Sequence, residues 1–150
     1  MPYSLTLKEI SSVISSTKFK VYPLKGDGSQ KKFYRITCST HSHNYIIMKI
    51  DDDPNRTNYN YWLSIQQSLK QAGIKCPDVI KKFQEKNTLV IEDCGDLLLN
   101  QTTNITSFLE KIANILITLQ TIPPQNHPFA WNSRKFVENK FYSELVFFKT

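Results

Sequence analysis

The sequence predicts an α+β fold: a five-stranded, mostly antiparallel sheet, one helix packed across it, and further helices after it. Apolar runs of strand length occur five times along the chain, and a segment with helical periodicity separates the third run from the fourth. Only helical patterns follow the fifth run. The chain has 150 residues, of which 40% are hydrophobic and 21% charged, enough for one core of moderate size.

The first expected element is a helix over residues 5–16. Thr6 and Glu9 form a capping-box pattern, and Leu5 and Ile10 occupy the positions of a hydrophobic staple around it. Its predicted apolar face consists of Leu7, Ile10, Val13 and Ile14.

Three strands are expected next. Residues 19–24 alternate in polarity and lead into a turn at Gly26–Ser29. Residues 33–38 also alternate, so that Tyr34, Ile36 and Cys38 share one face. Residues 45–50 are apolar on both faces, which is typical of a central strand.

A polar break at residues 51–55 separates these strands from a second helix. Its three aspartates suggest cation binding, but a solvated loop is the simpler interpretation because metal cages space their carboxylates along a loop. Thr57 is placed to cap the helix and Gly73 to end it. The expected apolar stripe consists of Tyr61 or Trp62, Ile65, Leu69 and Ala72.

Two short strands, at 79–83 and 88–91, complete the predicted sheet. A further helix is expected over 107–120, with Ser107 and Glu110 as its capping box. The aromatic segment 129–150 is predicted to be helical from about Arg134. Two interpretations stay open for it: a helix docked on the domain's own core, or a surface for something outside this chain.

Charge and composition limit the function classes. The formal net charge is +6, from 19 Lys and Arg against 13 Asp and Glu, and the basic residues are scattered. Solubility is the simpler explanation, and attraction to phosphorylated or nucleic-acid ligands is the alternative. No recognised nucleic-acid signature accompanies the aromatic residues, so we do not expect a nucleic-acid partner.

Cysteine usage and hydropathy indicate a cytoplasmic protein without a membrane partner. Cys38, Cys76 and Cys94 are widely spaced and form no CxxC pair, so we expect reduced thiols rather than a disulfide or a metal site. No apolar run approaches the roughly 18 residues of a membrane span. Residues 1–4 show no features of a secretory signal.

The turn at residues 26–29 is the strongest candidate for a binding site. Two glycines and a serine in a turn allow backbone N–H groups to approach an anion. Lys49, at the end of the third strand, is placed to add a point charge. The alternative is an ordinary hairpin turn, because Asp-Gly is a common turn signal.

Three segments resemble one family of kinases. Gly26–Arg35 resembles the "GDxSxRRYFR" segment of aminoglycoside-phosphotransferase-like proteins, Tyr45–Met48 resembles their "LVLM" strand, and Leu89–Asp96 resembles their "LLLEDLGD" hinge. Within the family, the closest likeness is to the bacterial kinases that phosphorylate the anomeric position of cell-wall amino sugars. The resemblance extends over roughly residues 20–150.

The resemblance implies a protein-kinase-like small lobe over residues 1–96, with a hinge at its end, and the first helices of a larger lobe over 97–150. ATP is the implied cofactor. The turn amides would cover its phosphates, Lys49 would contact them, and the backbone of the hinge would hold the adenine edge. The implied nucleotide-binding residues are Gly26, Asp27, Gly28, Ser29, Lys49, Glu92 and Cys94.

Two departures from the family pattern limit the expected activity. The helix expected after Thr57 contains no acidic residue to pair with Lys49. None of His41, His43 and His127 begins the H-x-D-x-x-x-x-N loop that supplies the catalytic base, so no catalytic or metal-binding residue is identified. We therefore expect a truncated kinase-like protein, inactive alone, in which Mg²⁺ binds only together with the missing lobe.

The alternative is a non-catalytic interaction domain. Here the aromatic segment 129–150 would bind a partner, either the missing large lobe or a second copy of the chain. Nothing in the sequence identifies the sugar substrate, because the resemblance assigns substrate contacts to the larger lobe.

Overall fold

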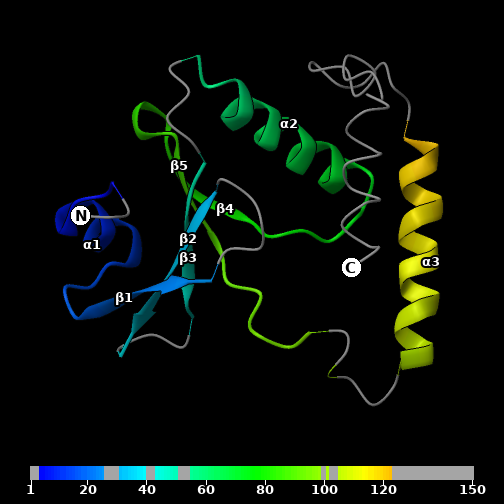
Figure 1. Cartoon of the computed structure of the whole chain (residues 1–150), viewed down its shortest axis with the longest axis horizontal. Helices are drawn as coiled ribbons and strands as arrows, with labels where there is room; N and C mark the ends of the chain where they lie inside the picture. The colour runs from blue at the N-terminus through cyan, green and yellow to red at the C-terminus, as the bar shows by residue number, and fades with distance from the viewer. Residues whose placement is uncertain are drawn as a thin grey trace, which may run out of the picture.

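Five strands form one antiparallel sheet in the order β1-β2-β3-β5-β4 (Figure 1). The computed structural model describes residues 4–25, 31–39, 43–50, 55–98, 101 and 105–122. The strands are β1 (Phe19–Leu24), β2 (Lys32–Cys38), β3 (Tyr45–Lys49), β4 (Val79–Phe83) and β5 (Thr88–Glu92). The helices are α1 (Leu7–Ile14), α2 (Thr57–Gln71), α3 (Ile105–Thr121) and the short 3₁₀-helix η1 (Gln84–Lys86). The predicted α+β class and the five-stranded sheet are confirmed.

The central position of β3 is also confirmed, because β3 pairs with β2 on one side and β5 on the other. Its side chains alternate between the two faces of the sheet. Ile46 and Met48 belong to the hydrophobic cluster on the α2 side, whereas Ile47 belongs to the cluster on the α1 side. A strand apolar on both faces therefore has a core on each side.

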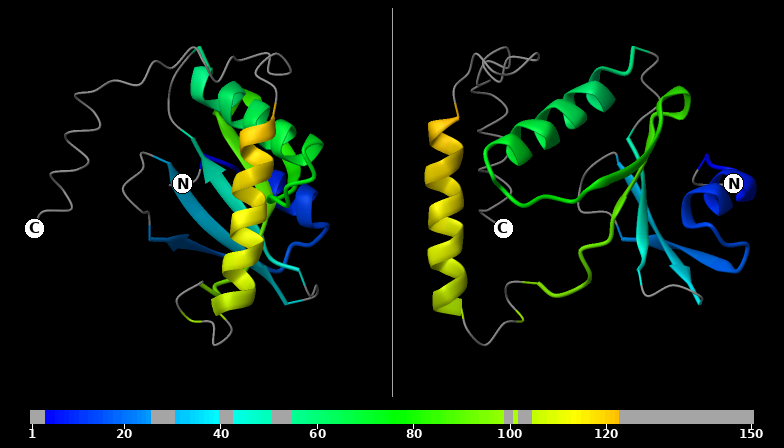
Figure 2. Two further views of the ribbon diagram at one scale, coloured as in Figure 1. Left: turned by 90° about the vertical axis from the view of Figure 1, so that its right-hand side faces the viewer. Right: turned by 180° about the vertical axis from the view of Figure 1, so that it is seen from behind.

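The predicted packed helix is present as α2, but α1 covers the opposite face, so two helices pack on the sheet rather than one (Figures 1 and 2). Ile10 and Ile14 of α1 pack against β2, β3 and β5. Tyr59 of α2 is 1% exposed and packs on the other face, beside Met48. Periodicity alone does not show on which face of the sheet a helix before the first strand packs, because that depends on contacts between distant segments of the chain.

The capping box of α1 is confirmed. The Glu9 backbone N–H donates to Thr6 Oγ1 at 3.2 Å, and the Thr6 N–H donates to Glu9 Oε2 at 2.7 Å. Leu5 and Ile10, the staple pair, are both buried. Leu7 is 53% exposed, so its assignment to the buried face is wrong. The helix is shorter than predicted because Ser15 adopts a left-handed conformation, φ 52°, directly after Ile14.

Helix α2 ends as predicted but begins differently. Gly73, at φ +74°, donates its N–H to the Lys70 carbonyl, and the Ile74 N–H donates to the Leu69 carbonyl, which is a Schellman ending. At the other end Arg56 occupies the cap position and makes no side-chain capping bond. Thr57 is therefore the first helical residue, and its predicted capping role is wrong.

The contact face of α2 agrees with the predicted stripe only at Trp62. The side chains that pack in the sheet cluster are Tyr59, Trp62 and Leu63. Tyr61, Ile65 and Leu69 lie outside this cluster. Several aromatic and aliphatic residues in succession fit more than one helical stripe, so periodicity did not define the face.

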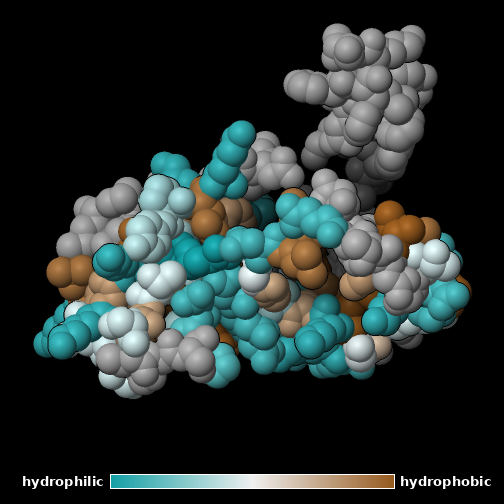
Figure 3. All heavy atoms as spheres, turned by 90° about the horizontal axis from the view of Figure 1, so that it is seen from below, coloured by the Kyte–Doolittle hydropathy of each residue, from teal (hydrophilic) through white to brown (hydrophobic). Residues whose placement is uncertain are grey.

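Helix α3 begins at Ile105, two residues earlier than predicted, so Ser107 lies inside the helix and the predicted capping box is wrong. It lies at the opposite end of the molecule from α1 (Figures 1 and 2). Its exposed hydrophobic residues include Ile105, Leu109, Ile115, Leu116 and Ile117. Figure 3 shows hydrophobic atoms at this end, and further hydrophobic patches in the middle and at the opposite end of the same face. The aromatic segment 129–150 lies outside the described residues.

No helix in the described ranges is long and apolar enough to cross a membrane.

Lys86, at the end of η1, forms an ion pair with α1 and hydrogen bonds with residues of β3 and β5. Its Nζ lies 2.7 and 2.6 Å from the two carboxylate oxygens of Glu9. Its carbonyl accepts bonds from Lys49 Nζ at 3.1 Å and Thr88 Oγ1 at 2.7 Å. The hydrogen bond with Lys86, together with those from Thr6, lowers the pKa of Glu9 from 4.5 to about 2.

The Glu9 carboxylate should make stability depend on pH in the acid range. Because its pKa is lowered in the folded state, its contribution is complete above pH 4.5 and is lost as the pH falls toward 2. Glu9→Gln keeps a side chain able to bond to Thr6 but removes the charge. We expect it to lower the free energy of unfolding by roughly 0.5–1 kcal/mol at pH 7.

Urea unfolding of both proteins between pH 7 and pH 2.5 measures this effect, and the difference should shrink below pH 4.5. Glu85→Gln is the matched control, because Glu85 is 83% exposed in its ion pair with Arg56. A Glu9→Gln difference that stays constant over this range would show that the charge of Glu9 does not stabilise the fold.

Candidate functional site

A hollow of about 460 Å³ lies on the α2 side of the sheet, where the chain leaves β5. Its apolar wall comes from four neighbouring strands, with Pro77 beside it. Its polar rim comes from the residue after β1, from β2, and from the end of β5 with the segment that follows it. The apolar wall consists of Leu24, Phe33, Ile46 and Ile91, and the rim of Lys25, Arg35, Glu92, Asp93, Cys94, Gly95 and Asp96.

The strand register explains why these apolar side chains meet. Leu24 pairs with Phe33 across β1 and β2, and Ile46 pairs with Ile91 across β3 and β5. Ile46 also pairs with Arg35 of β2. Directly paired residues of an antiparallel sheet project on the same face, so one face receives the whole wall. If the pairing of one of these strands slipped by one residue, the side chain that this strand contributes to the wall would face the α1 side.

The segment Glu92–Asp96 forms one edge of the hollow. The Glu92 N–H donates to the Asp78 carbonyl at 2.8 Å, and the Asp78 N–H donates to Glu92 Oε2 at 3.2 Å. Asp93 Oδ1 accepts the Gly95 N–H at 3.0 Å, and Gly95 has φ +82°, a conformation that glycine adopts without a steric penalty. These bonds fix the backbone where it leaves the sheet.

Arg35 holds this segment against β2. Its Nε lies 2.7 Å from Asp93 Oδ2, and its terminal nitrogens donate to Asp96 at 2.7 and 2.8 Å and to Asp93 at 3.1 Å. The bonds to Asp96 and Asp93 raise the pKa of Arg35, and the guanidinium lowers the pKa of Asp96. Asp93 is 5% exposed and Asp96 80% exposed, so the Asp93 contact is the one shielded from water.

Cys94 offers a backbone donor at the edge of the hollow. Among the residues that the structure describes, its N–H forms no hydrogen bond. Partial burial of the thiol raises the pKa of Cys94, and the nearby carboxylates of Glu92 and Asp93 raise it further. The thiol is therefore protonated at neutral pH, and the backbone N–H is the group available to a ligand.

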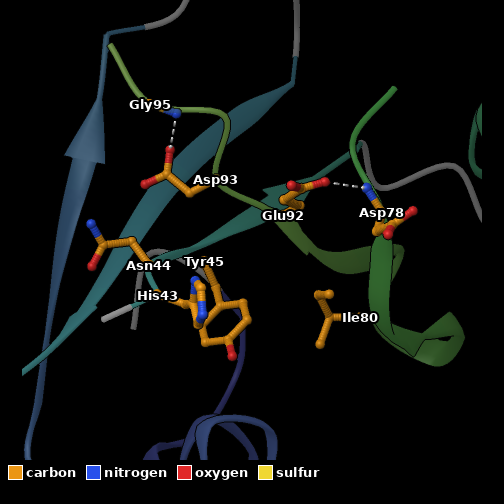
Figure 4. Close-up of a pocket in the computed structure, with 8 residues that line it drawn as sticks. All are labelled: His43, Asn44, Tyr45, Asp78, Ile80, Glu92, Asp93 and Gly95. Carbon is orange, nitrogen blue, oxygen red and sulfur yellow. Dashed lines mark hydrogen bonds between the residues drawn. The ribbon is translucent and has the colours of Figure 1, made fainter. Parts of the chain in front are cut away.

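A second hollow, of about 420 Å³, lies against the same segment on the side of Tyr45 (Figure 4). Figure 4 shows Glu92 turned toward Asp78 and Asp93 turned toward Gly95, with His43 close to Tyr45. The aspartates that line this second hollow already have partners, because Asp93 binds Arg35 and Asp78 forms an ion pair with Lys70. In the described ranges, no group of three or more His, Cys, Asp or Glu side chains is placed to hold a metal ion.

The predicted site residues are only partly brought together. Glu92 and Cys94 both border the first hollow. Lys49 lies at the other end of β3: it pairs with Thr88, whereas Tyr45 pairs with Glu92, and its Nζ donates to the Lys86 carbonyl. Met48, one residue earlier, faces α2. Gly26, Asp27, Gly28 and Ser29 lie outside the described residues.

Sequence reasoning missed the apolar wall and the role of Arg35. The alternation along β2 placed Phe33 and Arg35 opposite the buried Tyr34, which is the signal that would have grouped them with the hollow. Nothing local connects Arg35 to Asp93 and Asp96, which are 58 and 61 residues away along the chain.

Comparisons with protein-family models, curated protein sequences and solved structures find no match to this chain. The case for a function therefore depends on the hollow and its lining residues.

Arg35→Met should destabilise the fold, because it leaves the buried Asp93 carboxylate without its cation. We expect a loss of roughly 3 kcal/mol in the free energy of unfolding, measured by urea denaturation at pH 7. Asp96→Asn should cost far less, since Asp96 is exposed to water. Equal losses in the two variants would contradict the assignment of Asp93 as the shielded partner.

Proposed function

We propose that the hollow on the α2 side binds the adenine base of ATP. In this proposal the chain is the nucleotide-binding small lobe of an aminoglycoside-phosphotransferase-like kinase. The observation that carries it is an apolar wall from four strands that lies beside the segment Glu92–Cys94, where the chain leaves β5.

This combination suits a flat aromatic base with a polar rim. Leu24, Phe33, Ile46 and Ile91 supply the apolar surface that a planar ring needs. The Cys94 N–H would donate to a ring nitrogen, and the Glu92 carbonyl would accept from the exocyclic amine. Backbone groups do this regardless of side chain, so a cysteine at position 94 is compatible with the role.

The order of the elements also supports a kinase-like small lobe. The glycine-containing segment 26–29 lies between β1 and β2 in the sequence, and Lys25 and Phe33 on either side of it both line the hollow. Helix α2 follows β3, as a small-lobe helix would, and packs on the face that carries the hollow. Residues 97–150, including α3, would begin the larger lobe.

A phosphoryl-transfer site needs more than a pocket for the nucleotide base. Transfer of the γ-phosphoryl group needs a base for the acceptor hydroxyl and ligands for Mg²⁺. No group of three or more His, Cys, Asp or Glu side chains in the part of the chain that the structure describes is placed to hold a metal ion. The proposed function of this chain is therefore nucleotide binding, with transfer to a sugar hydroxyl assigned to a larger lobe.

Protein interaction is a second candidate function, favoured by the exposed apolar residues of α3. Leu109, Leu116 and Ile117 are each more than half exposed. Contiguous exposed apolar surface commonly marks an interface. This role is compatible with nucleotide binding, because the α3 residues are separate from those that line the hollow.

Cys94→Pro tests recognition by the backbone, because proline has no N–H. We expect this variant to bind ATP roughly tenfold more weakly than the unaltered chain in isothermal titration calorimetry. Cys94→Ala keeps the N–H and should bind as the unaltered chain does. Thermal unfolding of both variants checks that the fold is retained.

Equal affinities for the proline and alanine variants would rule out the Cys94 N–H as a donor. Absence of ATP binding by the unaltered chain at millimolar nucleotide would contradict the proposed function itself.

A further inference from the structure

The charged residues that line the hollow are divided between its two ends. Glu92, Asp93 and Asp96 stand at the end where the chain leaves β5, together with Arg35. Three carboxylates against one guanidinium make this end acidic. Lys25 lies at the other end, directly after β1. The hollow is therefore electrically polarised along the strands.

The Arg35 guanidinium is already paired with two carboxylates, which offset its charge. All three of its side-chain nitrogens contact the carboxylates of Asp93 and Asp96, at 2.7–3.1 Å. A phosphate at this end would also meet three negative groups. The acidic end thus favours the amine-bearing edge of a base and disfavours phosphate.

Lys49 is not placed to act in this hollow. Its Nζ donates to the Lys86 carbonyl, beside the ion pair of Lys86 with Glu9, and it does not line the hollow. The side chain that β3 directs toward α2 near this position is Met48, which is 1% exposed and carries no charge.

We infer that Lys25, and not Lys49, is the cation that contacts the phosphates of the bound nucleotide. Lys25 is exposed, lines the hollow and forms no ion pair among the described residues. It lies three residues along the chain from Tyr22, which pairs with Arg35 at the acidic end. At strand spacing this is about 10 Å, so a ligand with its base at Cys94 directs its phosphates toward Lys25.

This inference rests on the proposed function and gives the ligand an orientation. A lysine acts on phosphate as a point charge, so each added phosphate should increase the contribution of Lys25. Adenosine, which has no phosphate, should not depend on Lys25 at all. The two ligands therefore separate recognition of the base from recognition of the phosphates.

The experiment measures the affinities of the full chain for adenosine and ATP by calorimetry, at fixed low salt. Lys25→Gln should weaken ATP binding roughly fivefold to tenfold and leave adenosine binding unchanged. Lys49→Gln should change neither affinity by more than about twofold. Lys20→Gln, an exposed lysine of β1 away from the hollow, is the matched control for net charge.

The outcomes separate the two proposals. If adenosine binds but Lys25→Gln leaves ATP affinity unchanged, or if Lys49→Gln causes the loss, the assignment of Lys25 is overturned and the base site stands. If the unaltered chain binds ATP no more tightly than adenosine, Lys25 contacts no phosphate. If neither ligand binds, the proposed function fails, and the assignment of Lys25 fails with it.

Discussion

The register of β3 in the middle of the sheet is the constraint on which the rest of the structure depends. Ile46 and Met48 face α2 and Ile47 faces α1, so each face of one five-residue strand contributes to a different core. The same alternation places Ile46 in the hollow. A register of β3 shifted by one residue would turn Lys49 toward α2 and take Ile46 out of the apolar wall, so the fold and the candidate site share one requirement.

Arg35 connects that sheet to the segment that leaves it. Its pairing partner in β3 is Ile46, in the wall of the hollow, and its guanidinium holds Asp93 and Asp96. The backbone edge at Cys94 lies between these two aspartates in sequence. The ion pairs thus fix a potential hydrogen-bond donor beside an apolar surface, which is the preorganisation that a small-ligand site requires.

The parts of the fold that local chemistry determines were predictable from the sequence. The capping box of Thr6 and Glu9, the glycine ending of α2 and the alternation along β2 each depend on residues close together in the chain. The strand pattern predicted five strands, and all five form. The left-handed Arg56 at the start of α2 has no such local signal, because Thr57 is the better capping residue by type.

Other features depend on contacts between distant segments and could not be predicted. The position of α1 on the face opposite α2 depends on how Ile10 and Ile14 meet the finished sheet. The sequence did not show which face of the sheet Lys49 lies on. Its strand is apolar on both faces, so the alternation of polarity does not distinguish them. Of the residues predicted for the site, Glu92 and Cys94 do line the hollow. The pairing of Arg35 with Asp93 and Asp96 depends on the folded structure, because these residues are far apart in the sequence.

The most direct test of a base-binding hollow on the α2 side is to follow backbone amide and side-chain methyl NMR signals of the chain as ADP is added. The account predicts that the Cys94 amide shifts together with the methyl groups of Leu24, Ile46 and Ile91. The amide of Tyr45 and the methyl groups of Ile80, which line the hollow on the other side of the segment, should stay unchanged. Shifts confined to Tyr45 and Ile80, or no shifts at saturating nucleotide, would contradict it.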